Sequence, residues 1–136
     1  KHSVSRLAAA DRRVTVSGSL PDIRAAYAAS SIFVAPMQIG SGLQNKLLEA
    51  MSMQLPCVTT SIANAALGAQ PGTHILVADT AQSLADAILD LLQDPQLSSS
   101  IAQQGNTFVR QHFGWTQAVA KLETILNEVL ESKQTR

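Results

Sequence analysis

The residues with the clearest chemical potential form the loop and helix between Pro36 and Met53. Gly40, Ser41 and Gly42 come directly before the helix, where glycine lets the backbone approach a ligand closely. The first amides of a helix have no partner within it and carry partial positive charge, so they suit an anionic group such as a phosphate. Gly-Ser-Gly turns are also common in loops that bind nothing, so the motif alone leaves both interpretations open.

The same helix carries two charged residues, Lys46 and Glu49. Three positions apart, they can form a surface ion pair worth about 0.2–0.5 kcal/mol. The Glu49 carboxylate can instead accept hydrogen bonds from sugar hydroxyls. Leu43, Leu47 and Met51 fall on another side of the helix, which we expect to pack on a sheet.

Strand and helix patterns alternate along the chain, and these elements must position the loop. We expect strands at residues 13–16, 31–35, 56–60 and 73–78, and helices near 21–30, 43–53, 81–92, 95–112 and 116–131, with a helix already under way at the first residues. Strands separated by helices need crossover connections, which give a parallel sheet with helices on both faces. The predicted fold class is α/β, a Rossmann-like sheet of about four strands. Ligands bind such sheets beyond the carboxyl ends of the strands, where the Gly-Ser-Gly loop lies.

Composition narrows the range of functions. A chain of 136 residues suits one compact domain. Ten basic and ten acidic residues give zero net charge, which argues against nucleic acid or an anionic membrane as the main partner. The sequence has no apolar stretch long enough to span a membrane and nothing that resembles a signal peptide. We therefore expect a cytoplasmic protein, with peripheral association of the full-length protein at the inner face of a membrane left open.

The cysteine and the histidines give no sign of metal chemistry. Cys57 is the single cysteine and lies in an apolar run, so we expect a buried thiol and a reducing compartment. His2, His74 and His112 lack the clustered spacing of metal ligands. We expect no metal and no other cofactor, and we assign no catalytic residue.

A succession of short motifs adds a family resemblance. In order, the chain contains VSG (16–18), PD (21–22), Tyr27, AP (35–36), GSG (40–42), KLLEAM (46–51) and Pro56. This order resembles the donor-binding, C-terminal domain of retaining glycosyltransferases of family four, which have the two-domain GT-B fold. The resemblance is strongest to members that extend exopolysaccharide or surface-glycan chains, and it covers nearly the whole chain, including FGW at 113–115 and the last helix.

The resemblance implies a role for the loop and its helix in binding a nucleotide-sugar. Glu49 would hold the donor ribose, and the backbone amides of Ser41, Gly42 and Leu43 would bind the diphosphate. Lys46 would contact a phosphate or pair with Glu49, and its spacing favours pairing.

Two further segments are implied to border the donor. The stretch 17–20, with Gly18, Ser19 and Leu20, would lie beside the nucleobase. The stretch 37–40, with Met37, Gln38 and Gly40, would line the donor pocket.

The sequence departs from the family pattern at three places. Many relatives have a glutamate eight positions before the ribose-binding one, and here that residue is Ser41. Gln54 stands where relatives usually have glycine, so a left-handed backbone there would cost about 1–2 kcal/mol. Ala65 and Ala66 replace a frequent Glu-Gly pair, which removes another possible donor contact.

The resemblance also implies that residues 1–136 are part of a larger enzyme. The family's domain normally begins with a further strand, helix and strand, and the acceptor-binding domain precedes it. We expect the fragment alone to be inactive. The family's last helix braces the other domain, so we expect its apolar side to be partly uncovered here and to drive self-association through Val119–Leu130.

Three functions remain open from the sequence. The first is transfer of a sugar from a nucleotide-sugar donor to a glycan or lipid-linked acceptor in polysaccharide biosynthesis. The second is epimerisation of a nucleotide-sugar by a GT-B enzyme. The third is a non-catalytic α/β interaction module, in which the Gly-Ser-Gly segment is only a turn.

Overall fold

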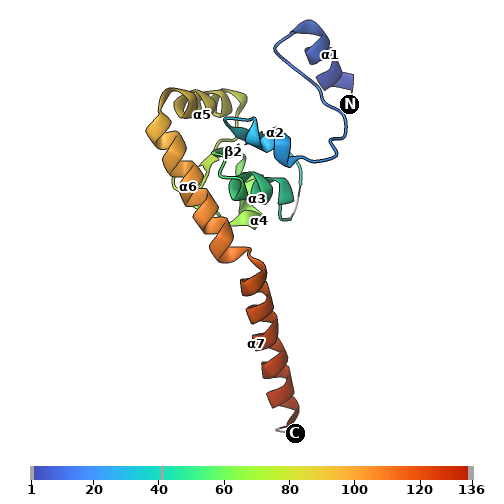
Figure 1. Cartoon of the computed structure of the whole chain (residues 1–136), viewed down its shortest axis with the longest axis vertical. Coiled ribbons are helices and arrows are strands. Elements are labelled where there is room, and N and C mark those ends of the chain that lie inside the picture. Colours follow the sequence, from blue (N-terminus) through green and yellow to red (C-terminus); the bar gives the residue numbers. More distant parts are fainter. Residues whose placement is uncertain (1, 41, 135–136) are drawn as a thin grey trace.

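The computed structural model describes residues 2–40 and 42–134. Its elements in chain order are α1 (His2–Ala10), α2 (Arg24–Ala28), β1 (Phe33–Ala35), α3 (Asn45–Ser52), β2 (Cys57–Thr59), α4 (Ser61–Leu67), β3 (Leu76–Val77), α5 (Ala81–Gln93), α6 (Pro95–His112) and α7 (Trp115–Gln134). The strands form one parallel sheet in the order β1-β2-β3, with Phe33 beside Cys57 and Val58 beside Leu76. Figure 1 shows α1 and α7 at opposite ends of the molecule, with the sheet and its helices between them.

Helices cover both faces of the sheet, as the sequence predicted. Successive residues of a strand point to opposite faces, so Cys57 and Val58 of the buried strand β2 enter different clusters. Cys57 packs with the α3 residues Leu47 and Met51, all three fully buried. On the other face, Val58 packs with residues of α5 and α6, Leu91 and Ile101.

Helix α6 joins the two layers. Its first half contributes Ile101 to the cluster on one face, and its second half contributes Phe108 and Val109 to the cluster on the other. Asp94 caps the start of the helix by accepting hydrogen bonds from the amides of Gln96 and Leu97, each over 2.9 Å. Pro95 at the first helical position fits this cap because the helix needs no donor there.

The predicted strand at residues 13–16 is wrong. These residues pair with no other strand in the described chain, and Val14 and Val16 are 40% and 51% exposed. A strand needs a neighbour to satisfy its amides and carbonyls, and the described chain brings none to this segment. The sheet therefore has three strands in the described residues, where the sequence suggested about four.

Helix α4 was missed by the sequence analysis. Its first residue, Ser61, donates from its amide and its hydroxyl to Asp79 Oδ1, over 2.8 and 2.9 Å. The cap comes from a residue 18 positions later in the chain. A cap supplied from such a distance leaves no local start signal in the sequence.

The buried thiol was predicted correctly. Cys57 is fully buried and lies 3.3 Å from the Leu55 carbonyl oxygen. Burial raises the pKa of its thiol to about 12. No helix in the described residues combines the length and apolar character that crossing a membrane requires.

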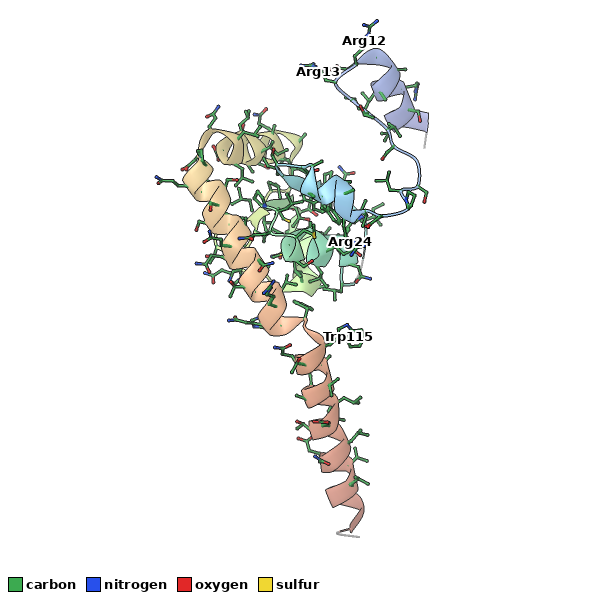
Figure 2. The ribbon with its side chains drawn as sticks, in the orientation of Figure 1. Arg12, Arg13, Arg24 and Trp115 are labelled. Carbon is green, nitrogen blue, oxygen red and sulfur yellow. The ribbon has the colours of Figure 1, made fainter. Side chains whose placement is uncertain are left out.

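Helix α7 extends away from the rest of the molecule (Figure 1). Trp115, at the start of this helix, is 87% exposed (Figure 2). The large apolar residues along α7 are 47–60% exposed; they are Val119, Leu122, Ile125, Leu126, Val129 and Leu130. The expectation that the apolar side of this helix is uncovered is therefore confirmed.

Helix α3 ends in a left-handed turn at a residue other than glycine. Gln54 has φ +59°, the Leu55 amide donates to the Ala50 carbonyl and the Gln54 amide to the Met51 carbonyl, each over 3.0 Å. These two bonds define a Schellman motif, in which glycine is the preferred left-handed residue.

We expect Gln54→Gly to raise the free energy of unfolding by about 0.5–1 kcal/mol. Relief of the left-handed strain, about 1–2 kcal/mol, exceeds the extra backbone entropy of glycine in the unfolded chain, about 0.5–1 kcal/mol. Urea unfolding measures the change, and Gln54→Ala, which keeps Cβ, is the control. A glycine variant no more stable than the alanine variant would contradict this account.

We expect Gly105→Ala to destabilise the protein by up to about 2 kcal/mol. A Cβ at Gly105 would lie 2.7 Å from the His74 carbonyl oxygen, which is closer than two nonbonded atoms of these types approach. Such overpacking costs about 1–3 kcal/mol, which outweighs the helix propensity that alanine gains over glycine, about 1 kcal/mol. Urea unfolding checks the sign, with exposed Gln104→Ala as the matched control on the same helix. Stabilisation of the Gly105 variant would show that α6 can move away from His74 without loss.

Candidate functional site

The loop after β1 is held in place by hydroxyl groups at the end of β2. Thr59 Oγ1 donates to the Ala35 carbonyl over 2.9 Å, and Thr60 Oγ1 donates to the Met37 carbonyl over 2.6 Å. Both threonines are buried. Two buried side chains thus fix the path of the loop as it leaves the carboxyl end of the strand.

Glycine is required at two points of this loop. Gly40 has φ +148° and Gly42 has φ +104°, values that other residues rarely adopt. The loop can therefore turn sharply into α3 with no side chain over the backbone at either position.

The loop directly before α3 leaves backbone donors unused. Among the described residues, the amides of Gly42 and Leu43 donate to no protein atom. The N-cap residue Gln44 provides no side-chain cap, and its Nε2 group instead donates to the Gly42 carbonyl over 3.3 Å. An uncapped helix start carries partial positive charge, so this end of α3 can stabilise an anion.

A pocket of about 600 Å³ lies beside this loop. Its walls come from the loop and from α4: Gln38, Ile39, Gly40, Gly42, Ile62, Ala65 and Ala66. We call it the loop pocket. It brings together three of the predicted site residues, Gln38, Gly40 and Gly42. Ala65 and Ala66 present only methyl groups to it, so its polar groups come from Gln38 and the backbone.

Glu49 lines a second pocket, of about 400 Å³. We call it the Glu49 pocket, and its residues come from the segment around α2 and from α3: Pro21, Asp22, Ile23, Arg24, Tyr27, Glu49, Ser52 and Met53. Glu49 therefore faces a pocket, but a different one from the loop pocket. The structure separates residues that the sequence analysis had placed along one continuous site.

Tyr27 is the functional neighbour that the sequence analysis did not assign. Its hydroxyl donates to Glu49 Oε2 over 3.0 Å, and its buried ring packs edge-on against Phe33. Burial, together with the bond to Glu49, raises the pKa of Tyr27 to about 12. A single tyrosine in an otherwise alanine-rich helix was the available signal, but its partner lies 22 residues away.

The ion pair at the rim of the Glu49 pocket contributes little stability. Arg24 and Asp22 lie 2.8 Å apart, and both side chains are largely exposed. The Arg24 guanidinium lowers the pKa of Asp22 through their hydrogen bond. Water screens such exposed pairs, so this one matters more for the charge at the rim than for folding. Figure 2 shows where Arg24 lies on α2.

The predicted pairing of Lys46 with Glu49 is wrong. Lys46 Nζ lies 3.3 Å from Met37 Sδ, and the two ion pairs of the described residues do not include it. Leu43 is 41% exposed and precedes the helix, so it does not share the buried face of Leu47 and Met51. The helix begins at Asn45, two residues later than predicted, so Leu43 does not lie on its apolar face.

The other predicted site residues do not gather at either pocket. Gly18, Ser19 and Leu20 are exposed and line neither pocket. Met37 packs against the core beside α3 and lines neither pocket. Ser41 lies outside the described residues. The roles of these residues in binding a donor stay predictions.

Comparisons with known proteins identify the class of protein. The parallel sheet flanked by helices matches the C-terminal domain of GT-B glycosyltransferases. Residues 1–94 match the family described as glycosyl transferases group 1, so the chain belongs to that family. A comparison with curated proteins found no significant match.

Two solved structures share this fold. Sucrose-phosphate synthase from Thermosynechococcus elongatus is 20% identical with a TM-score of 0.80, over 96% of this chain and 34% of that one. The C-terminal domain of a glycosyl transferase group 1 family protein from Francisella tularensis is 22% identical with a TM-score of 0.71, over 84% of this chain and 60% of that one. The chain thus spans about a third and three fifths of these two proteins.

Proposed function

We propose that residues 1–136 are the donor-binding part of a retaining glycosyltransferase of family four. The intact enzyme would move a sugar from a nucleotide-sugar to a glycan or lipid-linked acceptor in polysaccharide biosynthesis. The group 1 family match supports glycosyl transfer in general. Since the chain spans only part of its structural relatives, we propose that the acceptor-binding domain is supplied by a longer protein, and that the part alone does not turn over.

The observation that carries this proposal is that the amides of Gly42 and Leu43 donate to no protein atom in the part of the chain that the structure describes. A phosphate at a helix start gains about 0.3–1 kcal/mol from the helix dipole, with hydrogen bonds in addition. In glycosyl transfer the leaving diphosphate gains negative charge in the transition state. We propose that the amides of Gly42 and Leu43 bind this diphosphate, because donors already in place stabilise developing charge without reorganising.

Glu49 supports the same proposal from the next turn of the helix. It lies four residues after Asn45, about 6 Å along the helix axis, which suits the pentose next to a diphosphate bound at the helix start. Its Oε2 accepts from Tyr27, and within the described residues its Oε1 has no protein partner. That oxygen is available to accept from a ribose hydroxyl. The proposal includes no metal and no other cofactor.

We expect nucleoside diphosphates to bind the chain weakly and to shift the amide resonances of Gly42 and Leu43. A titration with ADP, GDP and UDP, followed by NMR and calorimetry, tests this. Glu49→Gln should weaken binding by about tenfold to a hundredfold, because a hydrogen bond to a charged group is worth about 1.5–3 kcal/mol. Glu123→Gln on α7 is the matched control and should bind like the wild type.

Two outcomes would favour a different function. A folded spectrum with no shift at Gly42 or Leu43 would favour a non-catalytic module. Binding by the chain, with exchange of sugar stereochemistry but no transfer by the intact enzyme, would favour a nucleotide-sugar epimerase.

We also propose that the isolated chain self-associates through α7. Val119, Leu122 and Leu126 recur at spacings of three and four, the pattern of a helix that packs against another helix. Each is about half exposed. A second copy would cover this stripe in the absence of another domain.

We expect a concentration-dependent dimer in sedimentation equilibrium. Leu126→Glu should give a monomer, because it places a charge within the stripe, whereas Asn127→Glu, one position around the helix, should still dimerise. A wild-type chain that stays monomeric at the highest concentration would contradict the proposal.

A further inference from the structure

The Tyr27 hydroxyl makes the only hydrogen bond to the Glu49 carboxylate within the described residues. The bond joins α2 to α3, two helices that otherwise meet at the wall of the Glu49 pocket. The Tyr27 oxygen also lies 3.5 Å from the Lys46 carbonyl, a much longer contact. The short bond to Oε2 therefore sets the direction of the hydroxyl.

The ring of Tyr27 is a fixed support for this hydroxyl. Only 6% of the residue is exposed, and its ring centroid lies 5.6 Å from that of Phe33 in a near-perpendicular arrangement. A buried ring cannot change rotamer without disturbing the core. The hydroxyl at its tip thus reaches the pocket from a position that the core holds constant.

Glu49 needs such a support because it is exposed. A glutamate on a helix surface has several rotatable bonds, and its carboxylate samples many positions in water. One bond to Tyr27 holds Oε2 beside the pocket that both residues line, and within the described residues Oε1 keeps no protein partner. With a pKa raised to about 12, the Tyr27 hydroxyl stays protonated, and hence a donor, well beyond the physiological range.

We infer that Tyr27 is a positioning residue for donor recognition, which orients Glu49 so that one carboxylate oxygen accepts from the pentose hydroxyls of a nucleoside diphosphate. This inference rests on the proposed function. Tyr27 does not contact the ligand itself in this arrangement, and its effect passes through Glu49. It should therefore affect ligands that carry a pentose and spare those that do not.

The test compares two ligands on four proteins. The proteins are the wild type, Tyr27→Phe, Glu49→Gln and the double variant, and the ligands are the tightest-binding of ADP, GDP and UDP and inorganic pyrophosphate. Tyr27→Phe keeps the buried ring and removes only the hydroxyl. We expect it to weaken nucleoside diphosphate binding about fivefold to tenfold, and to leave pyrophosphate binding within twofold of the wild type.

The double variant separates positioning from a general effect on the fold. Because Tyr27 acts through Glu49, adding Tyr27→Phe to Glu49→Gln should cause no further loss of affinity. Phe33→Leu, which alters the ring packing and keeps the hydroxyl, is the structural control. It should lower the melting temperature without changing the ratio of the two affinities.

Each contrary outcome has a distinct meaning. If the wild type binds the nucleotide and Tyr27→Phe binds it equally well, the inference is overturned and the proposed function stands. Equal losses for nucleotide and pyrophosphate, or further loss in the double variant, would also overturn the inference. A wild type that binds neither ligand would overturn both the inference and the proposed function.

Discussion

The buried strand β2 is the part of the molecule on which the other elements depend. It pairs with a strand on each side, and its successive side chains enter the apolar clusters on both faces of the sheet. At its end, the hydroxyls of Thr59 and Thr60 hold the carbonyls of Ala35 and Met37. The same three-residue strand therefore organises the core and fixes the loop that leads to α3. Few substitutions in it would leave both roles intact.

Helix α3 separates two pockets with different chemistry. Gly40 and Gly42, just before its start, line the loop pocket, while Glu49, one turn into the helix, lines a pocket formed partly by the segment around α2. The buried face of α3, with Leu47, Ala50 and Met51, packs in the core and so fixes the position of Glu49 relative to the loop.

The sequence predicted most of the architecture because the buried strands and the long amphipathic helices have strong local patterns. It predicted a strand at residues 13–16 because β-branched residues favour strands. A strand also needs a neighbouring strand to pair with, and the local sequence does not show whether one is present. It missed α4 because the cap comes from Asp79, and it left Tyr27 without a role because Glu49 is distant in sequence. The sharp turn at the loop glycines and the place of Glu49 on a helix were predictable because each reflects a local property, while the binding roles of these residues stay predictions. Contacts between distant segments, such as Ser61 with Asp79 and Tyr27 with Glu49, could not be predicted from the local sequence.

The Asp79 carboxylate ties the end of β3 to the start of α4, and α4 forms one wall of the loop pocket. The shape of that wall is therefore controlled by a residue that does not itself line the pocket. Insertions or replacements between Gly68 and Thr80 could shift α4 and remodel the cavity while the glycine loop stays unchanged. The shape of the loop pocket in such a domain can therefore change without replacement of any residue that lines it.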